Sequence, residues 1–144
     1  MSNLHAAIGL AQVEKLESYV THRRANHDLY AALLQEIPGL LLQPELEGCR
    51  NVYWMNGVVV DPVRFGMDRD ALMARLKEAG IDSRKFFLGM HAQKSLREYG
   101  CDCSGTFPVS TWLGENGLYL PSGSNLTPAD IERVSSCIRE LGKP

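Results

Sequence analysis

The sequence opens with MSNLHAAIGLAQVEKLESYVTHRRANHDLYAALLQEI, residues 1–37, and this stretch predicts one long helix around which the other 107 or so residues are organised. Its larger side chains recur mostly three or four positions apart, on one helical face: Val13, Leu16, Val20, His27, Tyr30, Leu34 and Ile37. Ser2 can cap the first turn, and Pro38-Gly39 ends the helix. At about 1.5 Å per residue the helix would be about 50 Å long, so its first third is expected to reach beyond the body.

The first third of this helix differs from the remainder. Residues 1–12 are small and apolar on nearly every face, and Ala6, Ala7, Gly9 and Ala11 would let another backbone approach closely. A helix that is apolar all round is normally buried. Either it is an ordinary core helix or, as we expect, it packs on a partner subunit or on a missing domain.

Composition places the chain among ordinary soluble proteins. It has 144 residues, 44% of them hydrophobic and 22% charged, which predicts a single domain over residues 1–144, with 1–37 as the helix and 38–144 as the body. A net charge of −2 argues against general nucleic-acid binding. No apolar run approaches the roughly 20 residues of a membrane span, and no secretory signal opens the chain. We expect a cytoplasmic protein.

The four cysteines, Cys49, Cys101, Cys103 and Cys137, are a weak indication of a metal site. Cys101-x-Cys103 has no second cysteine pair and no histidine at ligand spacing. We therefore expect reduced, free thiols and no bound zinc, with a redox or metal role as the alternative.

The body alternates short strand and helix signals. Strands are predicted at 40–42, 51–60, 81–87 and 118–120, the second with Gly57 at a bulge or a close approach. Helices are predicted at 68–79, 91–99, 107–116 and from Thr127 almost to the C-terminus. Asp68 is expected to cap the first of these, with Leu72 and Leu76 facing the core.

The last helix has the strongest start signal. Thr127 can cap it, Pro128 suits its first turn, and Asp130 can bond back to the cap. The apolar stripe that follows is Ile131, Val134, Ile138 and Leu141. Together these elements predict an α+β fold, with helices packed on a small, mainly antiparallel sheet whose strand order the pattern leaves open.

No self-contained catalytic constellation is present in the sequence. There is no glycine-rich phosphate loop and no serine elbow, and none of the five lysines lies in a setting that would activate it. The most site-like stretch is 81–93, with Arg84, Lys85, Phe86, Phe87 and His91. An arginine fork suits a pyrophosphate, and aromatic rings suit a sugar or a base. A core strand followed by a surface histidine is the alternative.

Several motifs resemble the DegT/DnrJ/EryC1/StrS family of sugar aminotransferases. The opening Met-Ser-x-Leu-x-Ala-Ala-Ile-Gly-Leu-Ala-Gln matches the start of the family's C-terminal region, with His5 where glutamine is common. Gly80-Ile-Asp-Ser-Arg84, Phe86-Phe87, His91-x-Gln93, Phe107-Pro108 and Tyr119-Leu-Pro-Ser-Gly123 follow in the family's order. They are most similar to members that aminate a nucleotide-linked 4-keto-6-deoxyhexose, the perosamine synthases among them.

The resemblance implies the C-terminal small domain of the aspartate-aminotransferase-like fold, from an enzyme that uses pyridoxal phosphate and glutamate. The family's cofactor-holding lysine and most of its phosphate contacts belong to an N-terminal domain with no counterpart here. No catalytic, cofactor-binding or metal-binding residue is therefore assigned, and the chain alone is expected to be inactive. Arg84 and His91, with Phe86 and Phe87, are the expected substrate contacts. The expected partners are the missing N-terminal domain, a second copy in a homodimer and the nucleotide-sugar substrate.

Two departures from the family pattern bear on selectivity. Lys85 replaces the proline usual after the arginine, and Gly89 stands where a proline is common before Met-His. A non-enzymatic alternative is a stand-alone assembly domain that uses the apolar face of residues 1–12. Burial of such a face is favourable at roughly 25 cal/mol per Å², and we expect a dimer or larger assembly under either interpretation.

Overall fold

The structure is a computed structural model that describes residues 1–142. Its helices and strands, in chain order, are α1 (Asn3–Glu14), α2 (Leu16–Leu34), β1 (Leu40–Leu42), β2 (Asn56–Val60), α3 (Pro62–Phe65), α4 (Arg69–Glu78), β3 (Arg84–Lys85), the 3-10 helix η1 (Met90–Ala92), α5 (Lys94–Glu98), α6 (Pro108–Asn116), β4 (Gly117–Leu120) and α7 (Pro128–Leu141).

The strands form one antiparallel sheet in the order β1-β2-β4-β3. Val58 of β2 lies opposite Leu118 of β4, and Arg84 of β3 lies opposite Tyr119 on the other side of β4. The predicted antiparallel sheet is confirmed. β4, which is last in the sequence, lies between β2 and β3, so the spatial order does not follow the chain order.

One face of the sheet forms the hydrophobic core with α2, α4 and α7. Side chains alternate between the two faces of a strand, so every second residue of β2 and β4 points toward these helices. The buried residues that meet there include Tyr30, Leu34, Val58, Val60, Leu72, Leu76, Leu118, Leu120, Ile131, Val134 and Ile138. The predicted core positions of the helices at 68–79 and after Thr127 are therefore confirmed.

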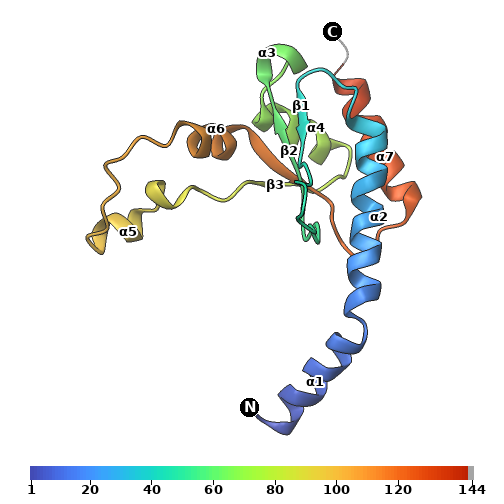
Figure 1. Cartoon of the computed structure of the whole chain (residues 1–144). Coiled ribbons are helices and arrows are strands. Elements are labelled where there is room, and N and C mark those ends of the chain that lie inside the picture. Colours follow the sequence, from blue (N-terminus) through green and yellow to red (C-terminus); the bar gives the residue numbers. More distant parts are fainter. Residues whose placement is uncertain (143–144) are drawn as a thin grey trace.

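Figure 1 shows α2 and α7 side by side along the sheet. The Arg139 guanidinium of α7 donates to the Leu33 carbonyl of α2 at 3.0 Å. The Thr127 capping box is present, because Asp130 Oδ2 accepts from the Thr127 N–H at 2.8 Å. The Arg139 contact joins the end of α2 to α7, and the capping box fixes where α7 begins.

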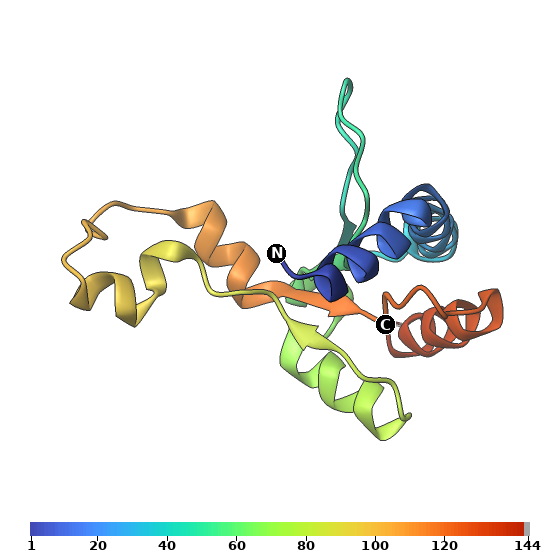
Figure 2. The same cartoon turned by 90° about the horizontal axis from the view of Figure 1, so that it is seen from below.

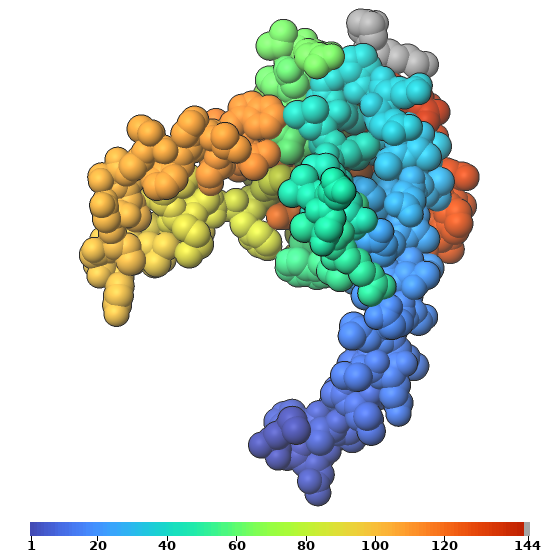
Figure 3. All heavy atoms as spheres, in the orientation of Figure 1, coloured from blue at the N-terminus to red at the C-terminus, as the bar shows by residue number. Residues whose placement is uncertain are grey.

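The single helix predicted over residues 1–37 is wrong, because the chain breaks between α1 and α2. Lys15, between them, has φ −105° and ψ 0°, and its N–H bonds to Gln12 and Val13 instead of continuing the ladder. Ser2 caps α1 as expected, accepting from the His5 N–H at 3.4 Å. No residue of α1 is buried, and Figures 1 and 3 show α1 standing clear of the body.

The break divides the apolar stripe of the opening stretch into two parts. Val20, His27, Tyr30 and Leu34 of α2 are buried, whereas Val13 and Leu16 are 67% and 53% exposed. The stripe therefore begins to contact the core only after the first turn of α2.

Two predicted strands are shorter than expected. The strand predicted at 51–60 begins only at Asn56, because Tyr53 adopts a left-handed conformation, φ +44°, that is incompatible with an extended strand. The strand predicted at 81–87 forms ladder pairs only at Arg84 and Lys85. Gly57 pairs regularly with Tyr119 and is not a bulge; the close approach is confirmed, since a Cβ there would lie 2.8 Å from the Phe86 ring.

Residues 87–107 leave the sheet edge and extend away from the body, as Figure 2 shows. The helix predicted at 91–99 is wrong as a single element: η1 and α5 are separated by Gln93, whose backbone is extended. The helices predicted at 68–79 and 107–116 are confirmed as α4 and α6, and Asp68 caps α4 by accepting from the Ala71 N–H at 2.8 Å.

Within residues 1–142 no helix is both long and apolar enough to cross a lipid bilayer.

Candidate functional site

A pocket of about 500 Å³ opens where β3 and β4 meet the loop 121–126. Its walls include Arg23, Trp54, Arg84, Phe87 and Tyr119. The volume falls within the range of small-molecule sites, which combine apolar walls with a few polar groups. This pocket joins residues from four distant parts of the sequence.

Arg84 is the cationic group on this wall whose guanidinium has no partner among residues 1–142; the Asp82 side chain lines the same pocket. It lies on β3 opposite Tyr119, on the exposed edge of the sheet. Within residues 1–142 its guanidinium makes no side-chain hydrogen bond and no ion pair, whereas Arg23, Arg24, Arg50 and Arg69 are all paired. An unpaired fork of N–H donors on a pocket wall is suited to a phosphate or a carboxylate.

Lys85 is bound in an ion pair instead of being free. Its Nζ lies 2.7 Å from Asp70 Oδ2, and Asp70 Oδ1 accepts from Arg69 Nε at 2.7 Å. These two cations, Lys85 first, lower the pKa of Asp70. Arg69 also donates to the Gly114 carbonyl at 2.6 Å, so this chain of contacts joins β3 to α4 and α6. Lys85, the departure from the family pattern, thus has a structural partner.

The loop 121–126 is attached to α2 by a row of polar side chains. The carbonyls of Pro121, Ser122 and Gly123 accept from Tyr30 Oη (3.1 Å), Arg23 Nη1 (2.9 Å) and Asn26 Nδ2 (3.4 Å) respectively. The Ser122 hydroxyl accepts from the Asn56 N–H at 2.8 Å, which joins this loop to the start of β2. The sequence analysis did not identify Arg23. The pattern that could have indicated it is the spacing of Arg23, Asn26 and Tyr30, three and four residues apart on α2, which places them on one face of the helix.

The two aromatic residues of the predicted site occupy different places. Phe87 is 67% exposed and lines the pocket beside Arg84. Phe86 is half-buried and stacks on Tyr119, with ring centroids 4.5 Å apart, under Gly57 and Gly117. Phe86 therefore packs against the Tyr119 ring on the face of the sheet away from the core, where it also lines an apolar pocket shared with Phe87.

His91 does not lie in the pocket of Arg84. Its Nε2 is 3.2 Å from Thr111 Oγ1, and its ring stacks on Phe107 at 4.6 Å between centroids. It lines a separate pocket of about 330 Å³ with Cys101 and Cys103. Gly89 accommodates this arrangement, because a Cβ at that position would lie 2.6 Å from the His91 ring.

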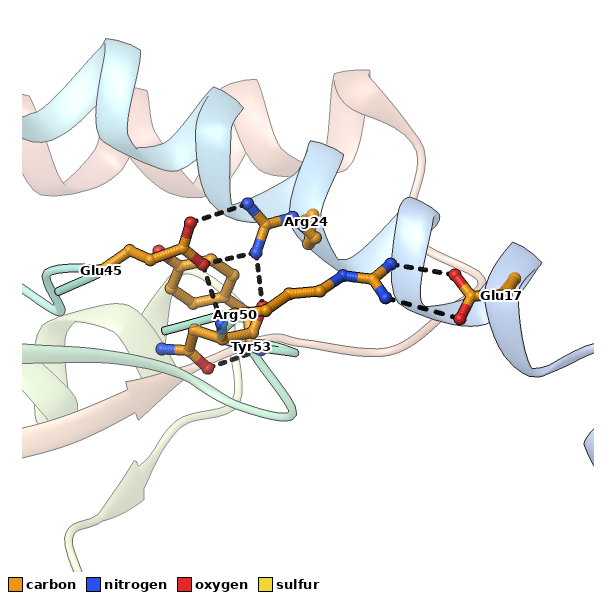
Figure 4. A network of polar contacts seen from close by, with 6 residues as sticks. Glu17, Arg24, Glu45, Arg50 and Tyr53 are labelled. Atoms are coloured by element: carbon orange, nitrogen blue, oxygen red, sulfur yellow. Dashed lines mark hydrogen bonds and ion pairs between the residues drawn. The ribbon is translucent and has the colours of Figure 1, made fainter. Parts of the chain in front are cut away.

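A polar network anchors the loop 43–55 to α2 (Figure 4). Arg24 binds both carboxylate oxygens of Glu45 and donates to the Asn51 carbonyl at 2.6 Å. Arg24, followed by the Asn51 N–H, lowers the pKa of Glu45 to about 2. Arg50 pairs with Glu17 near the start of α2 at 2.9 Å.

The residues described here do not fit a pyridoxal phosphate site. Lys15, Lys77, Lys85 and Lys94 are all exposed, and Lys85 is paired with Asp70; Lys143 lies outside the described residues. A lysine that forms an imine with a cofactor must lose its proton, which an exposed or ion-paired ammonium resists. No step of cofactor chemistry is therefore assigned to these residues.

In the described part of the chain, no three His, Cys, Asp or Glu side chains gather as metal ligands. Cys49, Cys101, Cys103 and Cys137 are free cysteines. The absence of stoichiometric zinc stays a prediction for metal analysis of the purified protein.

Comparison with known proteins gives consistent matches across the chain. Residues 1–139 match the model of the DegT/DnrJ/EryC1/StrS aminotransferase family. Over 139 residues the chain is 30% identical to GDP-perosamine synthase of Vibrio cholerae, covering 96% of this chain and 37% of that protein. The chain therefore spans little more than a third of that relative.

Solved structures agree with this match. The chain superposes on DesI, solved in the presence of its TDP-sugar product, with a TM-score of 0.86 and 29% identity over 99% of this chain and 36% of DesI. It superposes on the aminotransferase TlmJ from Streptoalloteichus hindustanus with a TM-score of 0.81 and 28% identity, over 94% of this chain and 35% of TlmJ. These likenesses confirm the expected α+β small-domain fold of pyridoxal-phosphate-dependent aminotransferases.

Proposed function

This chain belongs to the DegT/DnrJ/EryC1/StrS aminotransferase family, and on that premise we propose that it supplies the substrate-binding small domain of a nucleotide-sugar aminotransferase. The substrate is a nucleotide-linked 4-keto-6-deoxyhexose, and glutamate is the amino donor. Pyridoxal phosphate, the electron sink of this chemistry, is carried by a part of the enzyme outside these 144 residues. The similarity to GDP-perosamine synthase supports a role in deoxysugar synthesis for surface polysaccharide.

The observation that carries this proposal is the unpaired Arg84 on a pocket of about 500 Å³. Its guanidinium binds the diphosphate that joins the nucleoside to the sugar, because two parallel N–H donors match two phosphate oxygens. Phe87, exposed on the same wall, shields that ion pair from water. Phe86 acts behind them by fixing the Tyr119 ring.

His91 is a second substrate contact in this proposal. It lies in a different pocket from Arg84, at the start of the extended segment 87–107. A nucleotide sugar is elongated, with its hexose at the far end from its base, and in this proposal one substrate spans the two pockets. His91 then contacts the hexose while Arg84 binds the phosphates.

Substitution of Arg84 tests the phosphate contact. We expect Arg84→Ala to weaken GDP binding by about ten- to hundredfold in calorimetry, because a hydrogen bond to a charged group is removed. Arg64→Ala is the matched control, since Arg64 is an exposed arginine on α3, outside the pocket. Equal GDP affinity in the Arg84→Ala variant and the unmodified chain would contradict the proposed site.

Catalytic inactivity of the chain alone has a separate test. The purified chain is mixed with pyridoxal phosphate, glutamate and a GDP-linked 4-keto-6-deoxyhexose. We expect neither the absorbance of a lysine-bound cofactor nor an amino sugar, because the described lysines are exposed. Formation of an amino sugar would show that the chain is competent by itself.

A homodimer through α1 is the second part of the proposal, and it is also the core of the non-enzymatic alternative of an assembly domain. Leu4, Ile8, Leu10 and Val13 of α1 are all more than half exposed. Exposed apolar surface of this kind favours association.

The homodimer is tested by light scattering at micromolar concentration. We expect Ala7→Glu to convert the dimer to monomer, because it places a charge in the packed surface. Ala74→Glu on the exposed side of α4 should leave the dimer intact. A monomeric unmodified chain would overturn this part of the proposal and leave the Arg84 site untouched.

A further inference from the structure

Tyr53 has the most unusual backbone conformation in the described chain. Its φ of +44° is the one positive value at a residue other than glycine within residues 1–142. A bulky side chain in the left-handed region is strained, so the surrounding contacts must impose this conformation. Strain of this kind gathers at functional sites, which makes the neighbours of Tyr53 informative.

The contacts that impose this conformation are well defined. The Tyr53 ring, 4% exposed, stacks on His27 with centroids 3.5 Å apart and planes at 7°. Arg24 lies over the same ring, 5.7 Å from its centroid, and Figure 4 shows it beside both Tyr53 and Glu45. The Tyr53 N–H donates to Asn51 Oδ1 at 2.9 Å. Tyr53 is therefore held to α2 by its side chain, while its backbone is held by Asn51 of its own loop.

The next residue, Trp54, is turned outward as a consequence. It is 64% exposed and lines the same pocket as Arg84, and its carbonyl accepts from Arg23 Nη1. The same Arg23 nitrogen donates to the Ser122 carbonyl of the opposite wall at 2.9 Å. Arg23 therefore links the Trp54 carbonyl to the Ser122 carbonyl, while the Trp54 indole stays exposed to solvent.

We propose that Trp54 is the stacking surface for the nucleobase of the nucleotide substrate. This inference rests on the proposed function and assigns the base end of that substrate. An exposed indole on a backbone that is held by Arg23 offers a large flat area, and its few side-chain torsions leave little conformational entropy to lose on binding. Arg84 on the same pocket takes the phosphates, so the base extends toward Trp54 and the hexose toward His91.

The experiment compares GDP with inorganic pyrophosphate, which has the phosphates and no base. Calorimetry measures both ligands on the 144-residue chain. We expect Trp54→Ala to bind GDP about tenfold more weakly, as stacking of one base predicts, and pyrophosphate unchanged. Trp54→Phe should recover most of the lost affinity, because it restores an aromatic face. Arg84→Ala should weaken both ligands.

A fluorescence measurement reports on the indole directly. Trp112 is the other tryptophan of the chain and lies outside the pocket, so Trp112→Phe leaves Trp54 as the single tryptophan. In this variant we expect GDP to quench the emission and pyrophosphate to leave it unchanged. Calorimetry of Trp112→Phe itself should match the unmodified chain.

The outcomes separate the two proposals. If Trp54→Ala binds GDP normally while Arg84→Ala does not, the stacking role is overturned and the phosphate site stands. If Trp54→Ala weakens GDP and pyrophosphate equally, Trp54 only shapes the pocket, which also overturns stacking. If Arg84→Ala changes neither ligand, the phosphate contact of the proposed function fails. No binding of millimolar GDP to the unmodified chain would overturn both.

Discussion

Helices α1 and α7 share good capping signals, yet they relate to the rest of the molecule in opposite ways. α7 begins with the Thr127 capping box and buries Ile131, Val134 and Ile138. α1 begins with the Ser2 cap and buries no residue, although its composition is more apolar. Local signals therefore determine that a helix forms, while the arrangement of apolar residues determines whether this chain can bury it.

The difference lies in the distribution of apolar side chains around each helix. In α7 they form one stripe with polar residues opposite, which matches a single flat face of the sheet. In α1 they surround the helix, and a single flat face cannot cover them. α1 is thus suited to neighbours on several sides, in agreement with the homodimer that we propose.

The largest effect should come from truncating the same residue type in each helix. We expect Ile138→Ala to lower the free energy of unfolding by about 3 kcal/mol, because Ile138 is fully buried and leaves a cavity. Ile8→Ala, at a position 56% exposed, should change it by less than about 0.5 kcal/mol. Urea unfolding followed by circular dichroism measures both. The substitutions of this pair and of the capping pair are made in the Ala7→Glu background, so that the proposed dimer does not form. Equal losses for Ile138→Ala and Ile8→Ala would then show that α1 packs on the body of its own chain.

A smaller effect should come from the two helix caps. Thr127→Ala removes the hydroxyl that accepts from the Asp130 N–H, and we expect a loss of about 1 kcal/mol in the free energy of unfolding. Ser2→Ala should instead reduce helix content at residues 3–14 without moving the global urea midpoint. Hydrogen exchange of the α1 amides distinguishes the two. A shifted midpoint for Ser2→Ala would contradict the independence of α1.

The smallest effect concerns the pH dependence of stability, which we attribute to His27, a buried histidine of α2. Burial lowers the pKa of His27 below its ordinary value of 6.5, so the unfolded chain binds that proton more readily. Stability from His27 is therefore complete above about pH 6.5 and is lost as the pH falls toward the lowered pKa. We expect His27→Gln to flatten the fall in stability between pH 7 and 5, as measured by urea unfolding at each pH. An unchanged slope in the His27→Gln variant would contradict this assignment.

The elements that could be predicted are those with complete local signals. α4, α6 and α7 have a cap or an N-terminal proline together with an apolar stripe, and all were found where the sequence indicated. The kink at Lys15 involves neither proline nor glycine at that position and has no comparable signal. The early end of the strand predicted at 51–60 arises from the Tyr53 conformation, which depends on contacts with α2.

The site was predictable only in part for a related reason. Arg84 and Phe87 were chosen because they are neighbours in the sequence, and the structure places both on one pocket. His91, chosen from the same stretch, lies on another pocket, because the extended segment after Phe87 carries it away from the sheet. Arg23 and Trp54 reach the Arg84 pocket from distant positions, which only the packing of α2 against the sheet reveals.

The sequence by itself determined the helices α4, α6 and α7, the caps at Ser2, Asp68 and Thr127, the antiparallel character of the sheet and the family resemblance, because these depend on residues close together in the chain. Tertiary structure alone decided the strand order β1-β2-β4-β3, the break before α2 and the composition of the pocket. The strand order and the pocket depend on contacts between residues tens of positions apart, whereas the break at Lys15 has no signal in the sequence around it. Arg23 binding the Trp54 and Ser122 carbonyls is the clearest example, since one side chain there joins three separate segments.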